Sequence, residues 1–127
     1  MATRSNIAIE NQDGTVSSIY CHFDGYVEGV GDTLFEYYQS KEKLQELINL
    51  GDISSLGETI EETVAYHRDG GEDYNEPSKY KDVEEFFESF EQQYAYCLTK
   101  EGIHLVGKES SNQIFTLESV LNGEDCF

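Results

Sequence analysis

Two short segments of the sequence place a histidine two residues before an aspartate. His22 and Asp24 stand in Tyr-Cys-His-Phe-Asp-Gly, and His67 and Asp69 stand in Ala-Tyr-His-Arg-Asp-Gly. On a strand, residues two apart point to the same side, so each pair could present an imidazole and a carboxylate together. Two such pairs on adjacent strands would offer four ligands to zinc, manganese or iron.

A simpler interpretation places both histidines at strand ends, where the aspartates fix the imidazole tautomer and Asp-Gly forms a turn. Neither pair has the HExxH spacing that makes a zinc site specific. The metal site is therefore the alternative: a small metal-dependent hydrolase or nucleotide-binding protein, with Glu72 or Asp73 as the base for bound water. The preferred interpretation involves no cofactor. His104 has no acidic neighbour on its strand face and is expected to be structural.

The cysteines and serines offer no nucleophilic site. Cys21 stands next to His22, but adjacent strand residues face opposite ways and cannot share a proton. No serine has a GxSxG context, and no glycine-rich loop carries a phosphate-binding lysine. We therefore predict that the protein is not an enzyme.

The sequence favours a cytoplasmic location. Cys21, Cys97 and Cys126 are odd in number and lack CxxC spacing, which indicates a reducing compartment. No apolar run approaches the roughly 20 residues of a membrane span. Residues 1–9 also lack the layout of a secretion signal. We expect no membrane partner.

Acidic residues give the chain its most unusual property. The 127 residues include 26 Asp and Glu against 8 Lys and Arg, and Glu58–Glu91 alone holds twelve against three. The net charge of -18 repels nucleic acid, because a duplex presents about one negative charge per 1.7 Å. The same field attracts basic surfaces, so we predict a basic host protein of the nucleic-acid-binding kind as partner, and no direct nucleic-acid contact. Acidity that serves only solubility is the competing explanation.

The candidate partner-binding residues are carboxylates on a predicted helix and on the loop that leads to it, with two tyrosines between them. If the loop folds back on the helix, eight carboxylates gather within about 25 Å, at 1.5 Å per helical residue, and could imitate a phosphate track. The competing interpretation is a solvated helix face. The candidates are Asp69, Glu72, Asp73, Tyr74, Glu76, Tyr80, Glu84, Glu85, Glu88 and Glu91.

The elements that must position these groups follow from turn and cap signals. Asp13-Gly14 and Gly102 predict hairpin turns, Ser40 and Asp82 predict helix starts, and Gly51 predicts a helix end. The predicted elements are strands at 7–9 and 16–22, helices at 33–38 and 41–50, a turn at 51–57, a strand at 63–67, an exposed loop at 69–75, a helix at 83–90, strands at 94–98 and 103–106, and a last strand or helix start at 114–117.

This order predicts a single α+β domain over residues 1–127. The sheet is expected to be mostly antiparallel, in the order ββ-α-β-α-ββ, with the helices on one face. Residues 108–127 could form an extended tail. The aromatic stripe of the 83–90 helix is expected to face the core and its glutamates the solvent.

The segment from Thr3 to Tyr26, TRSNIAIENQDGTVSSIYCHFDGY, resembles a group of small uncharacterised proteins of tailed bacteriophages and prophages. Tyr20–Tyr26, Gly51–Gly57 and Tyr66–Asp73 carry the resemblance, over about half of the chain. Phe23 stands where this group often has Trp. The resemblance implies expression in the cytoplasm of an infected bacterium and fixes no chemistry.

Charge and resemblance together predict a phage accessory protein that acts by binding. It would imitate nucleic acid and inhibit a host defence enzyme or another nucleic-acid-binding enzyme. A plain interaction module is the third possibility, because the aromatic-rich sheet could form a homodimer.

Overall fold

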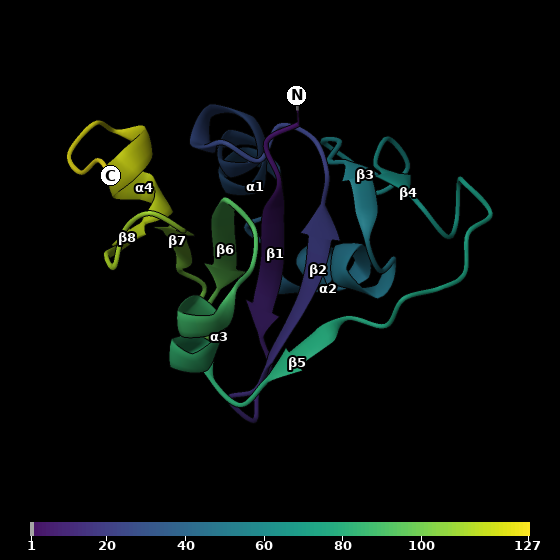
Figure 1. Ribbon diagram of the computed structural model, residues 1–127, viewed down its shortest axis with the longest axis horizontal. Coiled ribbons are helices and arrows are strands. Elements are labelled where there is room, and N and C mark those ends of the chain that lie inside the picture. Colours follow the sequence, from purple (N-terminus) through teal and green to yellow (C-terminus); the bar gives the residue numbers. More distant parts are fainter. Residues whose placement is uncertain (1) are drawn as a thin grey trace.

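One mixed sheet of eight strands forms the centre of the molecule in the computed structural model, which describes residues 2–127 (Figure 1). The strand order is β4-β3-β2-β1-β6-β7-β8, and β5 pairs with β2. The strands are β1 Ser5–Glu10, β2 Val16–Cys21, β3 Ile53–Ser55, β4 Val64–Ala65, β5 Ser78–Tyr80, β6 Tyr94–Leu98, β7 His104–Lys108 and β8 Ile114–Thr116. The helices are α1 Asp32–Tyr37, α2 Lys41–Asn49, α3 Val83–Ser89 and α4 Leu117–Leu121, and a π-helical turn, η1 Val27–Gly31, precedes α1.

The predicted α+β class is confirmed, but the expectation of a mostly antiparallel sheet in the order ββ-α-β-α-ββ is wrong. β1 pairs with β6 in parallel, and β2 pairs with β3 in parallel. Both pairings become possible because helices carry the chain back to the starting end of the sheet before the next strand begins. The segment predicted as a turn at 51–57 contains β3, and β5 was not predicted.

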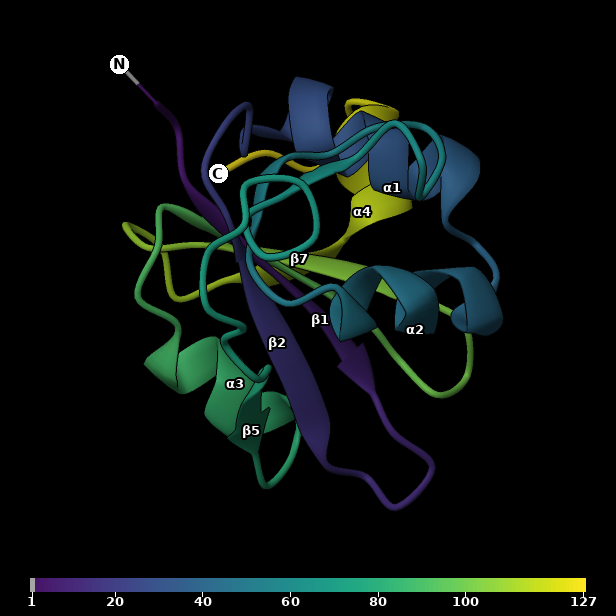
Figure 2. The same cartoon turned by 90° about the vertical axis from the view of Figure 1, so that its right-hand side faces the viewer.

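Helices cover both faces of the sheet, which corrects the expectation that they lie on one face (Figure 2). α1, α2 and α4 pack on the face to which Ile7, Ile9 and Ile19 point. α3 packs on the other face, where Ala8 and Ala95 leave room for its aromatic rings. Strand alternation explains the division, because neighbouring residues such as Ile7 and Ala8 point to opposite sides.

The local signals for turns and caps are confirmed. Gly14 and Gly102 have φ of +89°, in the left-handed region that each hairpin turn requires. The Ser40 hydroxyl accepts from the Lys43 amide at 3.3 Å at the start of α2. The Asp82 carboxylate accepts from the Glu85 amide at 2.8 Å at the start of α3. These side chains satisfy amides that a helix start leaves free.

The segment 108–127, which we expected could extend as a tail, contains β8 and α4. β8 pairs with β7, and Leu117 at the start of α4 is completely buried in the larger core cluster. Within residues 2–127, no helix is long and apolar enough to cross a membrane.

His104 is a buried structural residue, as its surroundings in the sequence suggested. Its Nε2 lies 3.0 Å from the Tyr38 carbonyl oxygen, which accepts a hydrogen bond from the neutral ring. Burial lowers the pKa of the imidazole, against a smaller raising effect of this hydrogen bond. The folded protein therefore favours the neutral form of His104.

We expect this neutral histidine to make stability depend on pH below neutrality. Its folded pKa is below the unfolded value of 6.5, so its contribution is intact above pH 6.5 and falls as the pH drops. His104→Gln keeps a donor for Tyr38 and removes the titration. Urea denaturation is measured between about pH 7 and 5.5, above the pH range in which carboxylates titrate. Over this range the variant should lose less stability than the unaltered protein. Equal losses in the two proteins would contradict this role.

Candidate partner-binding surface

The first His-x-Asp pair does not form a joint site. His22, just after β2, has its Nδ1 2.6 Å from the hydroxyl of Tyr20, so the imidazole pairs with a phenol of the preceding strand. Asp24 has φ of +58° and accepts from the hydroxyl of Tyr26 at 3.4 Å. The Asp24 carboxylate therefore belongs to the turn that leaves β2. The neighbouring Cys21 is no nucleophile either, because burial raises the pKa of its thiol to about 12.

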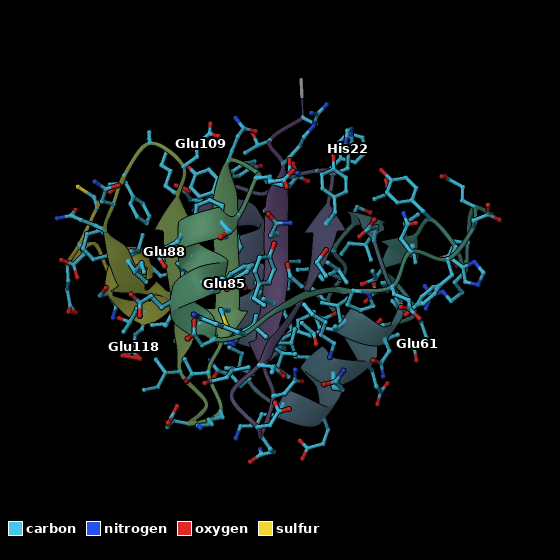
Figure 3. All side chains as sticks on the ribbon, turned by 60° about the horizontal axis from the view of Figure 1, so that its bottom comes forward. His22, Glu61, Glu85, Glu88, Glu109 and Glu118 are labelled. Atoms are coloured by element: carbon cyan, nitrogen blue, oxygen red, sulfur yellow. The ribbon has the colours of Figure 1, made fainter. Side chains whose placement is uncertain are left out.

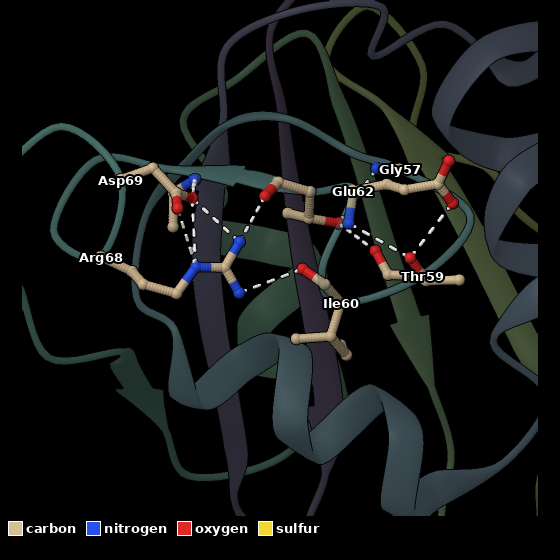
Figure 4. Close-up of polar contacts among 8 residues, drawn as sticks. Gly57, Thr59, Ile60, Glu62, Arg68 and Asp69 are labelled. Carbon is tan, nitrogen blue, oxygen red and sulfur yellow. Dashed lines mark hydrogen bonds and ion pairs between the residues drawn. The ribbon is translucent and has the colours of Figure 1, made fainter.

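Asp69 of the second pair holds the chain together (Figure 4). It forms an ion pair with Arg68 at 2.9 Å and accepts from the Ala65 amide at 2.8 Å. Hydrogen bonding by Arg68 lowers the pKa of the Asp69 carboxyl. The Arg68 guanidinium also donates to the carbonyl oxygens of Ile60 and Thr63, at 3.1 and 2.5 Å. Asp69 is therefore occupied within the fold, which leaves it poorly placed to bind a partner.

The two histidine segments are separated by a strand. Cys21 in β2 pairs with Ile53 in β3, and Ile53 pairs with Ala65 in β4, so the segments lie about 9–10 Å apart. His67 Nδ1 is engaged by the Glu72 carbonyl oxygen at 2.7 Å. No group of three His, Cys, Asp or Glu within residues 2–127 is arranged to hold a metal ion. This geometry offers no support for a metal-dependent hydrolase or nucleotide-binding protein.

The acidic loop does not fold back on α3. Residues 71–77 form no helix or strand, and the Tyr74 hydroxyl donates to the Asn49 carbonyl oxygen at 3.0 Å, at the end of α2. Figures 1 and 2 both show the stretch between β4 and β5 on a different side of the molecule from α3. Glu72, Asp73 and Glu76 are exposed there. The eight candidate carboxylates therefore do not form one surface.

We define the α3 acidic surface as Glu84, Glu85 and Glu88, which lie on the side of α3 away from the sheet. Glu84 and Glu88 are exposed, and Glu85 is half-buried because it accepts from the Lys81 amide at 3.2 Å. Figure 3 shows Glu85 and Glu88 on α3, and Glu61 across the molecule from them. Glu91, just beyond α3, lines a separate pocket with Tyr80.

Aromatic packing fixes α3 on the sheet. Phe86 is completely buried, and its ring centroid lies 5.3 Å from that of Tyr80 and 5.0 Å from that of Phe87. Gly107 on β7 lets Phe87 approach closely, because a Cβ there would lie 3.0 Å from the Phe87 ring. Burial raises the pKa of Tyr80. Tyr80 is thus mainly a packing residue, whereas Tyr74 is exposed beside His67.

A groove of about 510 Å³ runs between α3 and the β7–β8 hairpin. Phe87 and Phe90 of the α3 region line it together with the exposed Ile114 of β8. Glu84, Glu88 and Glu109 also line it, and Lys108 is its one basic residue. Glu109 and Ile114 were not predicted to belong to this surface, because only the β6–β7–β8 pairing brings them beside α3. The one signal in the sequence is the position of Ile114 directly after the polar run 108–113.

The carboxylates of this region have no basic partner in the fold. A single ion pair within 4.0 Å is found among residues 2–127, between Arg68 and Asp69. Lys108 lines the same groove, but no Lys or Arg nitrogen of residues 2–127 lies within 4.0 Å of a carboxylate of the α3 acidic surface. The field of this surface extends into solvent with a range of about 8 Å at physiological salt.

Comparison with known proteins gives no relative: no family, no curated protein and no solved structure matches this chain.

Proposed function

We propose that the protein acts by binding a basic protein partner through the α3 acidic surface and the adjoining groove. The observation that carries the proposal is a short helix, fixed by buried aromatic rings, that displays three carboxylates without an ion-pair partner. The partner is a host defence enzyme or another enzyme that holds nucleic acid in a basic groove. The protein is then a phage accessory inhibitor in the cytoplasm of an infected bacterium, as the resemblance of Thr3–Tyr26 implies.

The physical basis is imitation of phosphate charge. Glu84 and Glu88 stand one helical turn apart, with about 6 Å between their Cβ atoms, so they form a short row of negative charge. Lys and Arg side chains of a nucleic-acid groove can pair with this row. Their aliphatic stems can pack on Phe90 and Ile114, which line the groove next to the carboxylates. The net charge of -18 accelerates encounter with such a surface and repels free nucleic acid.

The test is capture of partners from bacterial lysate by the tagged protein and by a variant carrying Glu84→Gln, Glu85→Gln and Glu88→Gln. We expect the variant to bind its partner at least about tenfold more weakly, because three rim charges are lost together. Capture by the unaltered protein should fall steeply with added salt. Glutamine at position 85 can still accept from the Lys81 amide, so α3 should keep its start.

The matched control carries Glu36→Gln, Glu46→Gln and Glu61→Gln. These residues are exposed, accept no side-chain hydrogen bond in the described chain, and lie outside the α3 groove. Both variants lose the same charge, so a difference between them reports position rather than net charge. The proposal would be contradicted if the α3 variant captured as much partner as the unaltered protein. It would also be contradicted if the amount captured did not change with salt concentration. Light scattering of the same samples reports whether the protein is a homodimer.

A further inference from the structure

A second, smaller pocket lies on the α3 face of the sheet, outside the groove described above. Its volume is about 180 Å³, and it is lined by Asn6 of β1, Ser18 of β2, Tyr80 of β5 and residues of two loops. The loop residues include Asp52, just before β3, and Glu91, just after α3. Three strands and two loops therefore meet at this pocket.

Two buried polar atoms in this pocket have no partner. Ser18 is only 3% exposed, and neither its Oγ nor the buried Oδ1 of Asn6 has a hydrogen-bond partner within residues 2–127. Ala8 pairs with Ser18 and Asn6 with Tyr20, so Asn6 and Ser18 are diagonal neighbours on one face of adjacent strands. Buried polar atoms are normally satisfied, and leaving one unpaired is unfavourable. An occupant that donates hydrogen bonds would satisfy both atoms.

The charge of the lining selects the kind of donor. Asp52 and Glu91 both line the pocket, and none of its lining residues is Lys, Arg or His. Asp52 is held in place, because it accepts from the Tyr20 amide at 3.0 Å and from the Asn75 side-chain amide at 3.2 Å. Carboxylate oxygens have further lone pairs for additional donors. Anions are therefore disfavoured, and a cation rich in N–H groups is favoured.

We propose that this pocket binds a guanidinium group. A guanidinium is planar, carries five N–H donors in a fixed fork, and is less strongly hydrated than an ammonium ion. It can donate to Asn6 and Ser18 inside the pocket while its charge is met by Asp52 and Glu91. The volume of about 180 Å³ leaves room for a planar guanidinium and a short aliphatic stem. The proposal is independent of the α3 acidic surface.

The guanidinium could belong to a free small molecule or to an arginine side chain of a peptide, and the experiment separates these sources. Isotope-labelled protein is titrated with n-propylguanidine and, separately, with a capped Gly-Gly-Arg-Gly-Gly peptide, while backbone amide resonances are followed. We expect saturable shifts centred on Asn6, Ser18 and Gln92. Binding of the peptide identifies an arginine side chain as a fitting ligand, and binding of propylguanidine alone identifies a small molecule.

Neutral ligands and pocket variants provide the controls. Propylurea and the citrulline peptide have the same shape without the charge and should bind at least about tenfold more weakly. Ser18→Ala removes an unpaired hydroxyl, so it should leave the fold intact and weaken binding about tenfold, whereas Glu91→Gln should weaken it severalfold. Glu88→Gln, outside the pocket, should change nothing. The absence of saturable shifts with both guanidinium ligands, equal binding of the urea, or unchanged binding by Ser18→Ala would overturn the proposal and leave a pocket that holds water.

Discussion

Replacing Phe86 by alanine is expected to lower the free energy of unfolding by about 3–5 kcal/mol, the range for removing a buried phenylalanine ring. Phe86 is completely buried, between α3 and the strands β1 and β6. The cavity left behind cannot refill easily, because Ala8 and Ala95 opposite the ring are too short to reach into it. Urea denaturation followed by circular dichroism measures the change.

Ser89→Ala is the matched control, because Ser89 is an exposed residue of the same helix and should change stability by no more than about 0.5 kcal/mol. The total free energy of unfolding of a native domain is about 5–15 kcal/mol, so the Phe86 variant should remain mostly folded at low temperature. Partner capture should nevertheless weaken, because α3 loses its anchor. A loss below about 1 kcal/mol would mean that α3 is not anchored through this ring.

The second large effect is expected for Leu117→Ala, which should lower the free energy of unfolding by about 2–5 kcal/mol. Leu117 is completely buried at the start of α4. Gly31 of η1 lies close against it, since a Cβ at Gly31 would be 3.1 Å from Leu117 Cδ1. Thermal or urea denaturation of the variant provides the measurement.

The neighbouring substitution Glu118→Ala alters an exposed side chain of the same helix and should change stability little. Both variants introduce alanine, the strongest helix former, so a difference between them reports the loss of packing. If the two variants were equally stable, residues after Lys108 would behave as an extended tail, and the docking of α4 on the core would be refuted.

The parts of the fold that could be predicted are those determined by a few consecutive residues. Asp13-Gly14 and Gly102 mark the hairpins, and Ser40 and Asp82 cap the starts of α2 and α3, as expected. The stripe of Phe86, Phe87 and Phe90 gave the buried face of α3, and thus the exposed position of Glu84 and Glu88. The conformation of a few residues predicts the turns and helix starts, and the spacing of apolar residues predicts the buried face of α3.

The parts that could not be predicted depend on which distant segments meet. Alternation shows that Ile7 and Ile9 share a face but does not show that β6 lies beside β1. The path of the acidic loop depends on the Tyr74 and Asn75 contacts with Asn49 and Asp52, which have no sequence signature. For the same reason, neither the α3 groove nor the pocket around Ser18 could be located beforehand.

The parallel contact of β1 with β6 has a consequence for biosynthesis. The two strands are about 90 residues apart in the sequence. β1 therefore cannot pair with β6 until β6 has left the ribosome. At about 5–20 residues per second, the nascent chain carries one open edge of its central strand for about 5–20 s. Fragments that stop before Tyr94 lack β6 and keep that edge permanently, and they should aggregate or recruit chaperones where the full-length chain does not.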